Sequence, residues 1–297
     1  MQNLILLAGM LLSSYSVTIE NDSLVNLPAA QHLNVAYGED PQQKMDIYLP
    51  AGRDTVNTVL LILVHGGSWT RGDKAAFTPY ITALQQRLPG YAFANINYRL
   101  FNGTQNRFPA QENDLKAAYD FLVSRYAEYG YSKKIVLMGA SAGAHLALLQ
   151  AYKHAPAVRP SAIISFFGPT DLRRLYNHPG LPAVPYLLTG ITGTTPQQDP
   201  ETYKASSPIH FVTAQAPPTH LLHGEADHLV PPDQARLLRD TLKAAGVPHD
   251  LVFYAGAGHG WRGKQLEDSF NRIKAFLEKH VTTAVAAKRS RTSAKLQ

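Results

Sequence analysis

Apolar residues recur along the chain in two alternating patterns. Eight short runs, rich in β-branched and aromatic residues, have the length and composition of strands. The first two alternate between apolar and polar residues, which predicts an antiparallel hairpin, whereas later runs such as Leu60–Val64 are continuously apolar, as expected of parallel strands buried on both faces. The predicted strands cover residues 33–37, 44–49, 58–64, 92–98, 135–138, 162–167, 220–222 and 251–254.

Helical periodicity fills the spaces between the later runs. Apolar residues at intervals of three and four predict a helix that begins near Gln111, and the almost wholly apolar segment 142–152 predicts a buried helix. Amphipathic patterns predict further helices over 233–245 and 265–280. Such alternation predicts a mostly parallel sheet with right-handed crossovers, covered by helices on both faces. We therefore expect one α/β domain over residues 32–280.

One stretch interrupts this alternation. About fifty residues, rich in proline, separate the strand that ends at Phe167 from the strand that begins at His220. A structureless connection of that length is unusual inside a compact domain unless it forms a lid or a binding element. We therefore expect residues 171–207 to form a small cap insertion over the carboxyl edge of the sheet.

Composition and charge exclude several classes of function. The 297 residues are 45% hydrophobic and 17% charged, which is typical of a globular domain, and they include no cysteine. Disulfides, thiolate metal sites and cysteine nucleophiles are therefore excluded. Four of the six net positive charges lie in the last ten residues, which leaves a nearly neutral body, and we expect no nucleic-acid partner. Residues 281–297 are expected to be a disordered basic tail.

The N-terminal segment carries a possible export signal. Residues 1–19 contain no charged side chain, and Leu4–Leu12 is apolar apart from small residues. This run is too short to span a bilayer, which needs about 20 residues, but it matches the hydrophobic region of a signal peptide, followed by small residues at Ser14 and Ser16. No Lys or Arg follows Met1. We expect a secreted or periplasmic protein without stable membrane insertion; a packed N-terminal element in a cytoplasmic protein is the alternative.

The strongest chemical signal is a G-x-S-x-G motif at residues 139–143, between a predicted strand and the apolar helix. A serine on so sharp a turn takes a strained backbone conformation, so the residues two before and two after it must be small. The N-terminus of the helix behind it favours developing negative charge. We therefore expect Ser141 to be a nucleophile, the alternative being an ordinary glycine-rich turn.

A serine nucleophile needs a base, and the base needs an orienting acid. In this architecture serine, acid and histidine follow in that order, each after a later strand. His259 lies on a glycine-rich loop directly after the last predicted strand and is the expected base. Asp227, in the loop after the penultimate strand, is the expected acid, with Glu225 and Asp171 as rivals. The other histidines in or near predicted elements are His220, His223, His249 and His280.

The His-Gly-Gly segment that begins at His65 follows another predicted strand. Acyl transfer passes through an oxyanion that needs two N–H donors, each worth about 3–4 kcal/mol. We expect one donor to be the backbone N–H of Ala142 and the other to come from Gly66 or Gly67, because a residue without Cβ lets the backbone approach closely. His65 is expected to orient this loop, and Trp69 to be either a pocket wall or a core anchor.

These motifs resemble those of the α/β-hydrolase fold, and specifically HGG-type carboxylesterases similar to hormone-sensitive-lipase-like and feruloyl-esterase-like bacterial enzymes. The resemblance covers about residues 35–280. It depends on segments that arrive in the family's order: His65-Gly66-Gly67, Asn97-Tyr98-Arg99-Leu100, the turn at Ser141, Phe167-Gly168-Pro169-Thr170-Asp171-Leu172, Ser207-Pro208, Gly224-Glu225-Ala226-Asp227 and Gly258-His259.

The resemblance implies a mostly parallel eight-stranded sheet with a small cap. It also implies roles for individual residues. By this resemblance, the nucleophile is Ser141, the acid is Asp227, the base is His259, and the oxyanion-hole donors are Gly66, Gly67 and Ala142. One departure is Ser68, where lipase-like members often have a third glycine, and it argues against esters of bulky alcohols.

Together these features predict a serine carboxylesterase that cleaves short-chain or aryl esters through an acyl-enzyme. Its partner is a small-molecule ester, and the chemistry needs no metal or organic cofactor. A serine peptidase or amidase on the same fold is one alternative, although such peptidases usually carry a large extra N-terminal domain. A catalytically silent binding protein is another, since a fold does not fix a function. That protein would be expected to lack a triad member or the glycine pair.

Overall fold

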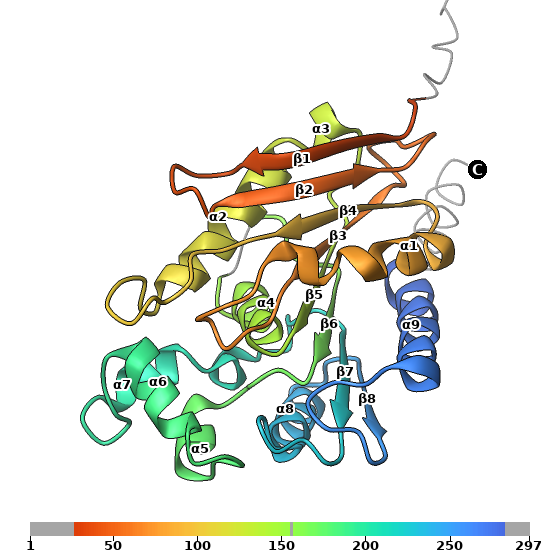
Figure 1. The fold of residues 1–297 in the computed structure, drawn as a ribbon. Helices are drawn as coiled ribbons and strands as arrows, with labels where there is room; N and C mark the ends of the chain where they lie inside the picture. The colour runs from red at the N-terminus through yellow and green to blue at the C-terminus, as the bar shows by residue number, and fades with distance from the viewer. Residues whose placement is uncertain (1–26, 155–156, 283–297) are drawn as a thin grey trace, which may run out of the picture.

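The computed structural model describes residues 27–154 and 157–282 (Figure 1). The expected signal segment 1–19 lies outside the described residues, as does most of the expected tail. An eight-stranded sheet forms the centre, in the order β1-β2-β4-β3-β5-β6-β7-β8. The strands are β1 (Ala30–Ala36), β2 (Lys44–Leu49), β3 (Val59–Val64), β4 (Tyr91–Ile96), β5 (Ile135–Ala140), β6 (Ala162–Phe166), β7 (Thr219–Gly224) and β8 (His249–Tyr254).

The strand directions agree with those expected from the hydrophobic pattern. β1 pairs antiparallel with β2, and β2 pairs antiparallel with β4. All the remaining neighbours, from β4 across to β8, pair in parallel. The predicted mostly parallel, eight-stranded sheet is therefore confirmed.

Helices cover both faces of the sheet. In the described part of the chain they are α1 (Thr78–Arg87), α2 (Ala110–Ser124), α3 (Tyr126–Tyr129), α4 (Ala142–Tyr152), α5 (Leu172–Asn177), α6 (Val184–Thr192), α7 (Pro200–Ala205), α8 (Asp233–Ala244) and α9 (Gly263–Leu277), with short 3-10 turns at Lys74–Ala76 and Pro208–Phe211. α9 continues as a π-helical turn, Glu278–Thr282, in which Val281 is buried, so ordered structure extends past residue 280. Within residues 27–154 and 157–282, no helix has the length and hydropathy of a membrane span.

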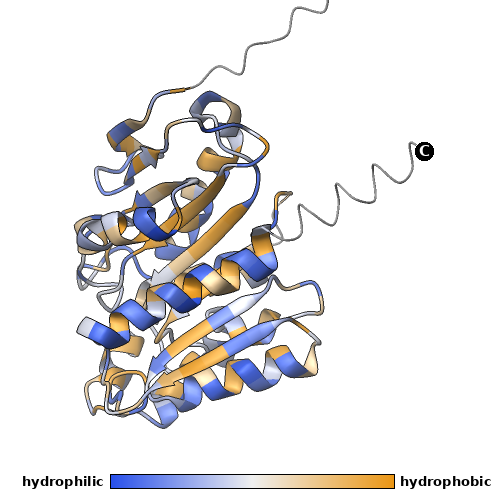
Figure 2. Ribbon diagram, turned by 90° about the vertical axis from the view of Figure 1, so that its right-hand side faces the viewer, coloured by the Kyte–Doolittle hydropathy of each residue, from blue (hydrophilic) through white to orange (hydrophobic). Residues whose placement is uncertain are grey.

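The central strand β3 shows why helices are needed on both faces of the sheet. All six of its residues are buried, and successive side chains point to opposite faces. Leu60, Ile62 and Val64 pack with α2 and α4, whereas Leu61 and Leu63 pack with α1 and α9. Figure 2 accordingly shows mostly hydrophobic strands between helices whose outer faces are hydrophilic.

The expected insertion at 171–207 contains three helices, α5, α6 and α7, which lie together at one end of the sheet (Figure 1). Prolines that suggested irregular structure stand in the first turn of two of them, Pro185 in α6 and Pro200 in α7. Proline is favoured there because its missing N–H has no partner in that turn anyway. Asp171 caps α5, and Asp199 caps α7, each by accepting a backbone N–H with its side chain.

Candidate active site

Ser141 occupies the sharp turn between β5 and α4. Its backbone has φ 53° and ψ −120°, a left-handed conformation that is strained for a residue with a side chain. Its N–H donates to the carbonyl of Phe166 at 2.8 Å, which ties the turn to the neighbouring strand. A Cβ on Gly139 would lie 2.4 Å from the backbone of Gly143, and a Cβ on Gly143 would lie 2.1 Å from the carbonyl oxygen of Val64. Both motif glycines are therefore required by backbone packing.

Three side chains from separate loops meet at this turn. His259 Nε2 lies 2.8 Å from Ser141 Oγ, and His259 Nδ1 lies 2.7 Å from Asp227 Oδ2. The carboxylate accepts from Nδ1–H, so Nε2 is the unprotonated nitrogen and accepts from the serine hydroxyl. This arrangement can remove the hydroxyl proton as the oxygen attacks a carbonyl carbon.

The Asp227 carboxylate is fully hydrogen-bonded although it is buried. Oδ1 accepts the backbone N–H groups of Leu229 and Val230 at 2.9 and 3.0 Å. Oδ2 faces His259 and also His223, whose Nε2 lies 3.3 Å away and 2.8 Å from the Val230 carbonyl. Burial alone would raise the pKa of Asp227, but the hydrogen bonds from His223 and His259 hold that pKa well below its usual range. Asp227 is therefore an anion at neutral pH.

The two rival acids lie elsewhere. Glu225 is an exposed residue in the turn after β7. Asp171 accepts the backbone N–H of Arg174 and so caps α5. Of the three carboxylates considered from the sequence, Asp227 is the one that contacts His259.

The loop after β3 brings a second backbone segment against the serine turn. A Cβ on Gly66 would lie 2.8 Å from the carbonyl oxygen of Ala140 and 3.2 Å from Ser141 Cβ. Gly67 has φ +115°, and a Cβ there would lie 2.0 Å from the Arg71 carbonyl oxygen. Among the described residues, the backbone N–H groups of Gly66, Gly67 and Ala142 have no hydrogen-bond acceptor. They are therefore available to an oxyanion.

Buried aromatic and polar side chains hold this loop in place. Nδ1 of His65 donates to the Gly66 carbonyl at 2.7 Å, and the imidazole stacks on Tyr98 with 4.3 Å between ring centres. Tyr98 donates its hydroxyl to the His65 carbonyl at 2.9 Å. Burial lowers the pKa of His65, so its ring is neutral. His65 contacts the loop and not the serine, which agrees with the role expected for it.

Two residues after the glycine pair also have left-handed backbone conformations. Ser68 has φ 55°, and Trp69 has φ 59°. A glycine would take this conformation without strain, so a glycine would suit the position of Ser68. Trp69 is buried and packs edge-on against Phe108 and His145 while also lining a cavity beside Ser141. It is therefore both a core anchor and a pocket wall.

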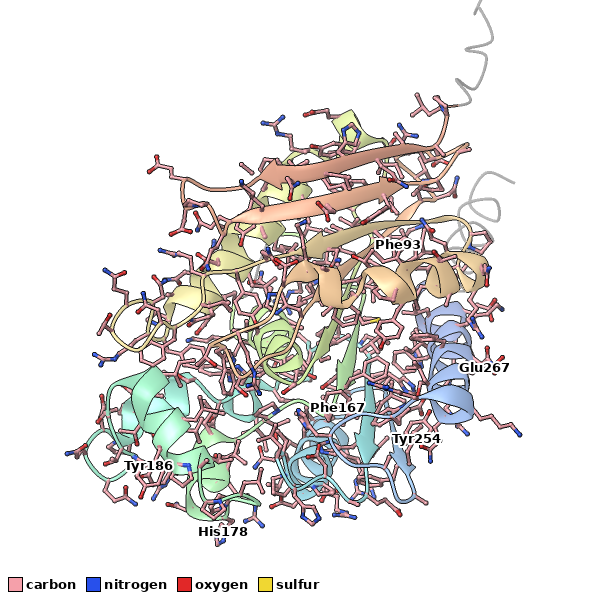
Figure 3. All side chains as sticks on the ribbon, viewed as in Figure 1. Phe93, Phe167, His178, Tyr186, Tyr254 and Glu267 are labelled. Atoms are coloured by element: carbon pink, nitrogen blue, oxygen red, sulfur yellow. The ribbon has the colours of Figure 1, made fainter. Side chains whose placement is uncertain are left out.

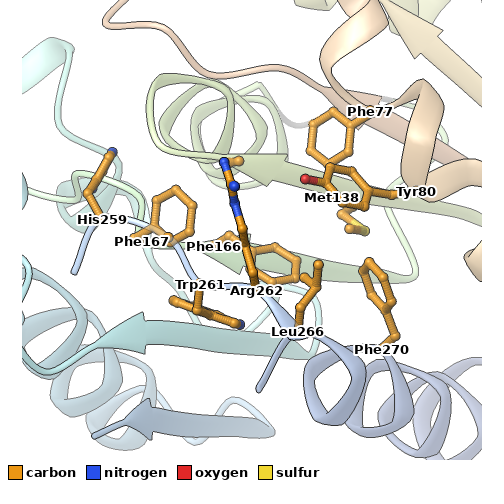
Figure 4. Close-up of a pocket in the computed structure, with 12 residues that line it drawn as sticks. Phe77, Tyr80, Met138, Phe166, Phe167, His259, Trp261, Arg262, Leu266 and Phe270 are labelled. Atoms are coloured by element: carbon orange, nitrogen blue, oxygen red, sulfur yellow. The ribbon is translucent and has the colours of Figure 1, made fainter. Parts of the chain in front are cut away.

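Two cavities of very different size adjoin the three side chains. The small one, about 20 Å³, is lined by Ser141 and by cap residues that include Leu175, Val184 and Leu187. The large one, about 490 Å³, is lined by His259 and by aromatic rings from α1, β6 and α9 (Figure 4). Within the described residues, no group of three or more His, Asp or Glu side chains is arranged to hold a metal ion.

Sequence reasoning missed two contributors to this site. Nothing in the sequence distinguishes His223 of β7 from the other histidines in or near predicted strands; its contact with Asp227 arises because the loop after β7 folds back toward the strand. Phe167 has φ 42°, and its ring lies 4.6 Å from the His259 ring. Figure 3 shows Phe167 beyond the end of β6, near the centre of the molecule. No feature of the sequence indicates that a phenylalanine has a positive backbone φ angle.

Residues 45–242 match the family model BD-FAE, which amounts to more than half of the chain. The chain belongs to the BD-FAE family. The resemblance to α/β-hydrolase esterases that the motifs indicated is therefore confirmed.

Individual relatives and solved structures are also similar to the chain. The chain is similar to esterase LipQ of Mycobacterium tuberculosis, with 31% identity over 78% of this chain and 59% of the relative, so it spans less than two thirds of that protein. It is also similar to Thermogutta terrifontis esterase 2. The structure phosphonylated by sarin is 26% identical, with a TM-score of 0.70, and the match covers 84% of this chain and 94% of that one. The structure with butyrate bound is 26% identical, with a TM-score of 0.68, and the match covers 86% of this chain and 95% of that one. A truncated carbohydrate esterase from gut microbiota is 25% identical, with a TM-score of 0.70, and the match covers 84% of this chain and 98% of that one.

Proposed function

We propose that the protein is a serine carboxylesterase that hydrolyses short-chain or aryl carboxylic esters through an acyl-enzyme. The observation that carries this proposal is the unbroken hydrogen-bonded series from Ser141 Oγ through His259 to Asp227, with separations of 2.8 and 2.7 Å. Family membership and the similar esterases support it. Each of the three side chains comes from a different loop at the carboxyl edge of the sheet, so their meeting is not a consequence of local sequence.

The geometry supports a two-step mechanism. Ser141 Oγ attacks the ester carbonyl carbon while His259 Nε2 takes the hydroxyl proton. The oxyanion of the tetrahedral intermediate accepts hydrogen bonds from the backbone N–H groups of Ala142 and of Gly66 or Gly67. The bond to the alcohol oxygen then breaks, and His259 gives its proton to that oxygen. Water, deprotonated by His259, attacks the acyl-enzyme and releases the carboxylic acid and free Ser141.

The proposed preference for a short acyl chain follows from the small cavity beside Ser141. Its volume of about 20 Å³ leaves little space for methylene groups, and it is lined by apolar side chains of the cap. A short-chain acid, butyrate, is bound in a structure of the similar Thermogutta terrifontis enzyme. Longer acyl chains would require the cap helices α5 and α6 to move.

The test is hydrolysis of p-nitrophenyl acetate, butyrate and octanoate by the full chain, with and without a serine-directed phosphonate. We expect phosphonate-sensitive turnover that declines with chain length, and covalent labelling of Ser141. Ser141→Ala should abolish turnover and labelling without changing the melting temperature. Residual activity above about a tenth of wild type would exclude Ser141 as the nucleophile.

Two further results would favour the alternatives. Hydrolysis of p-nitroacetanilide at a rate matching or exceeding that of p-nitrophenyl acetate would favour an amidase or peptidase. The absence of both turnover and labelling, in protein with a cooperative melting transition, would favour a binding protein.

A further inference from the structure

The large cavity beside His259 has the dimensions and the lining of a ligand site. Its volume of about 490 Å³ falls within the range of about 300–1,000 Å³ usual for small-molecule pockets. Phe77 just before α1, Tyr80 of α1, Phe167 beyond β6 and Trp261 before α9 contribute aromatic rings to its walls. Aromatic walls bind a flat ring through stacked and edge-to-face contacts. The lining therefore fits an aryl group.

An exposed cation without a counter-ion is among the residues that line this aromatic cavity. Figure 4 shows the Arg262 side chain pointing into the pocket among the rings. No carboxylate is among the residues that line the cavity, and within the described residues the guanidinium has no ion pair or hydrogen bond. A guanidinium is always charged at neutral pH, and its planar donors match a carboxylate. Arg262 therefore offers a binding partner for an acid group on the ring.

The backbone next to Arg262 adds to the positive potential. Arg262 is the residue immediately before α9, a helix of 15 residues. The first turn of α9 contains no acidic side chain, and no side chain caps its N–H groups. Because a helix N-terminus carries a partial positive charge, it reinforces the preference for an anion at this end of the cavity.

The position of the cavity indicates which half of an ester it holds. His259 lines the large cavity and Ser141 does not, whereas Ser141 lines the small one. In the proposed mechanism His259 delivers a proton to the departing alcohol oxygen, so the alcohol lies on the histidine side. The acyl group then lies on the serine side, against the cap.

Resting on the proposed esterase function, we infer that this cavity is the leaving-group subsite and selects phenols that carry a carboxylate, with Arg262 as the specificity-determining residue. The preferred substrate class is a short-chain ester of a hydroxybenzoate. In the acylation step the bond from the acyl carbon to the phenolic oxygen breaks, a bond from that carbon to Ser141 Oγ forms, and the phenolic oxygen takes the proton from His259.

Two esters that differ only in charge test this inference. They are 4-acetoxybenzoate and its neutral methyl ester, which share the acyl group and the ring. The measured quantity is the ratio of kcat/KM for the anion to kcat/KM for the neutral ester. We expect Arg262→Gln to lower this ratio about fivefold, as for the loss of a partly exposed ion pair, and high salt to weaken the wild-type preference.

The matched control is Lys264→Gln. Lys264 is exposed, as Arg262 is, and carries the same charge two residues further along the chain, but it does not line the cavity. Its replacement should leave the ratio within about twofold of wild type, because an exposed charge outside the cavity is screened by solvent. Equal ratios for wild type and Arg262→Gln would overturn the inference, as would equal decreases in both variants.

A binding measurement separates this inference from the proposed function. Calorimetric titration of Ser141→Ala protein with 4-hydroxybenzoate measures the subsite without turnover. We expect binding that Arg262→Gln weakens about fivefold. If Ser141→Ala binds 4-hydroxybenzoate in this way but the wild-type protein hydrolyses no ester, the result would support the subsite and contradict the esterase. Hydrolysis of p-nitrophenyl acetate without any binding of 4-hydroxybenzoate, and with an unchanged ratio in Arg262→Gln, would support the esterase and overturn the subsite.

Discussion

His223 Nε2 lies 3.3 Å from Asp227 Oδ2, the same carboxylate oxygen that His259 Nδ1 reaches at 2.7 Å. Two imidazoles therefore converge on one oxygen, while two backbone N–H groups hold the other. His223 is buried and also donates to the Val230 carbonyl, so its orientation is fixed by the loop that carries Asp227. We therefore expect His223 to be a positioning residue that acts on His259 through the carboxylate.

Replacing His223 by phenylalanine removes this donor from a buried carboxylate. The loss is worth about 1.5 kcal/mol, which corresponds to about a tenfold decrease in kcat with little change in KM. His223→Gln keeps a side-chain N–H and should recover most of kcat. Steady-state kinetics on p-nitrophenyl acetate, with melting temperatures for both variants, check this expectation. A wild-type kcat in His223→Phe would show that the second histidine is dispensable.

Elements fixed by local sterics and by strict periodicity could be predicted from the sequence. The limits of β2 and α4 agree with the predicted segments 44–49 and 142–152. Ser141 could be located because the glycines of G-x-S-x-G are required where two backbone segments pack closely. A Cβ at Gly143 would clash with the Val64 carbonyl. His259 could be selected among twelve histidines because of its place after the last strand.

Features that depend on tertiary contacts could not be predicted. The cap helix α6 contains Pro185, and composition alone does not distinguish a proline in the first turn of a helix from one that ends a helix. Helix α1 was missed because its fully buried face is limited to Ile81 and Leu84. The cavity around Arg262 combines α1, β6 and α9, which are separated by nearly the whole length of the domain.

Gly143→Ala should destabilise the protein strongly. The added Cβ would lie 2.1 Å from the backbone oxygen of Val64, so β3 or α4 must shift, and such overpacking costs about 1–3 kcal/mol or more. Gly90→Ala is the matched control, because nothing lies within 4 Å of a Cβ at Gly90. Thermal unfolding of the two variants gives the comparison. Equal melting temperatures would mean that the turn can relax around an alanine.

His220 makes folding stability sensitive to acid. Burial lowers its pKa to about 4, and among the described residues neither ring nitrogen has a hydrogen-bond partner. In the unfolded chain the pKa is about 6.5, so below that pH the unfolded state binds more protons. Stability therefore decreases as the pH falls from about 6.5 toward 4. The ring stacks on Phe276, with 5.0 Å between ring centres, and an aromatic replacement keeps that contact.

We expect His220→Phe to reduce the acid sensitivity of the protein. Between pH 7 and 5 its loss of unfolding free energy should be smaller than that of wild type by about 1–2 kcal/mol. His178→Phe, at an exposed position in the cap region, should behave as wild type. Urea unfolding of the three proteins at both pH values measures these differences. An identical pH dependence in His220→Phe and wild type would show that His220 is not the group responsible.

The cap provides the most direct control of acyl length. Leu187 of α6 lines the small cavity beside Ser141, and truncating it to alanine enlarges the space that the acyl chain enters. Each methylene group that becomes buried contributes about 0.8 kcal/mol, so the ratio of kcat/KM for p-nitrophenyl octanoate to that for acetate should rise at least about fivefold. Leu181→Ala is the matched control, because Leu181 belongs to the same insertion but is 41% exposed and does not line the cavity. An unchanged ratio in Leu187→Ala would place the acyl chain elsewhere, and the large cavity beside His259 would then be its alternative location.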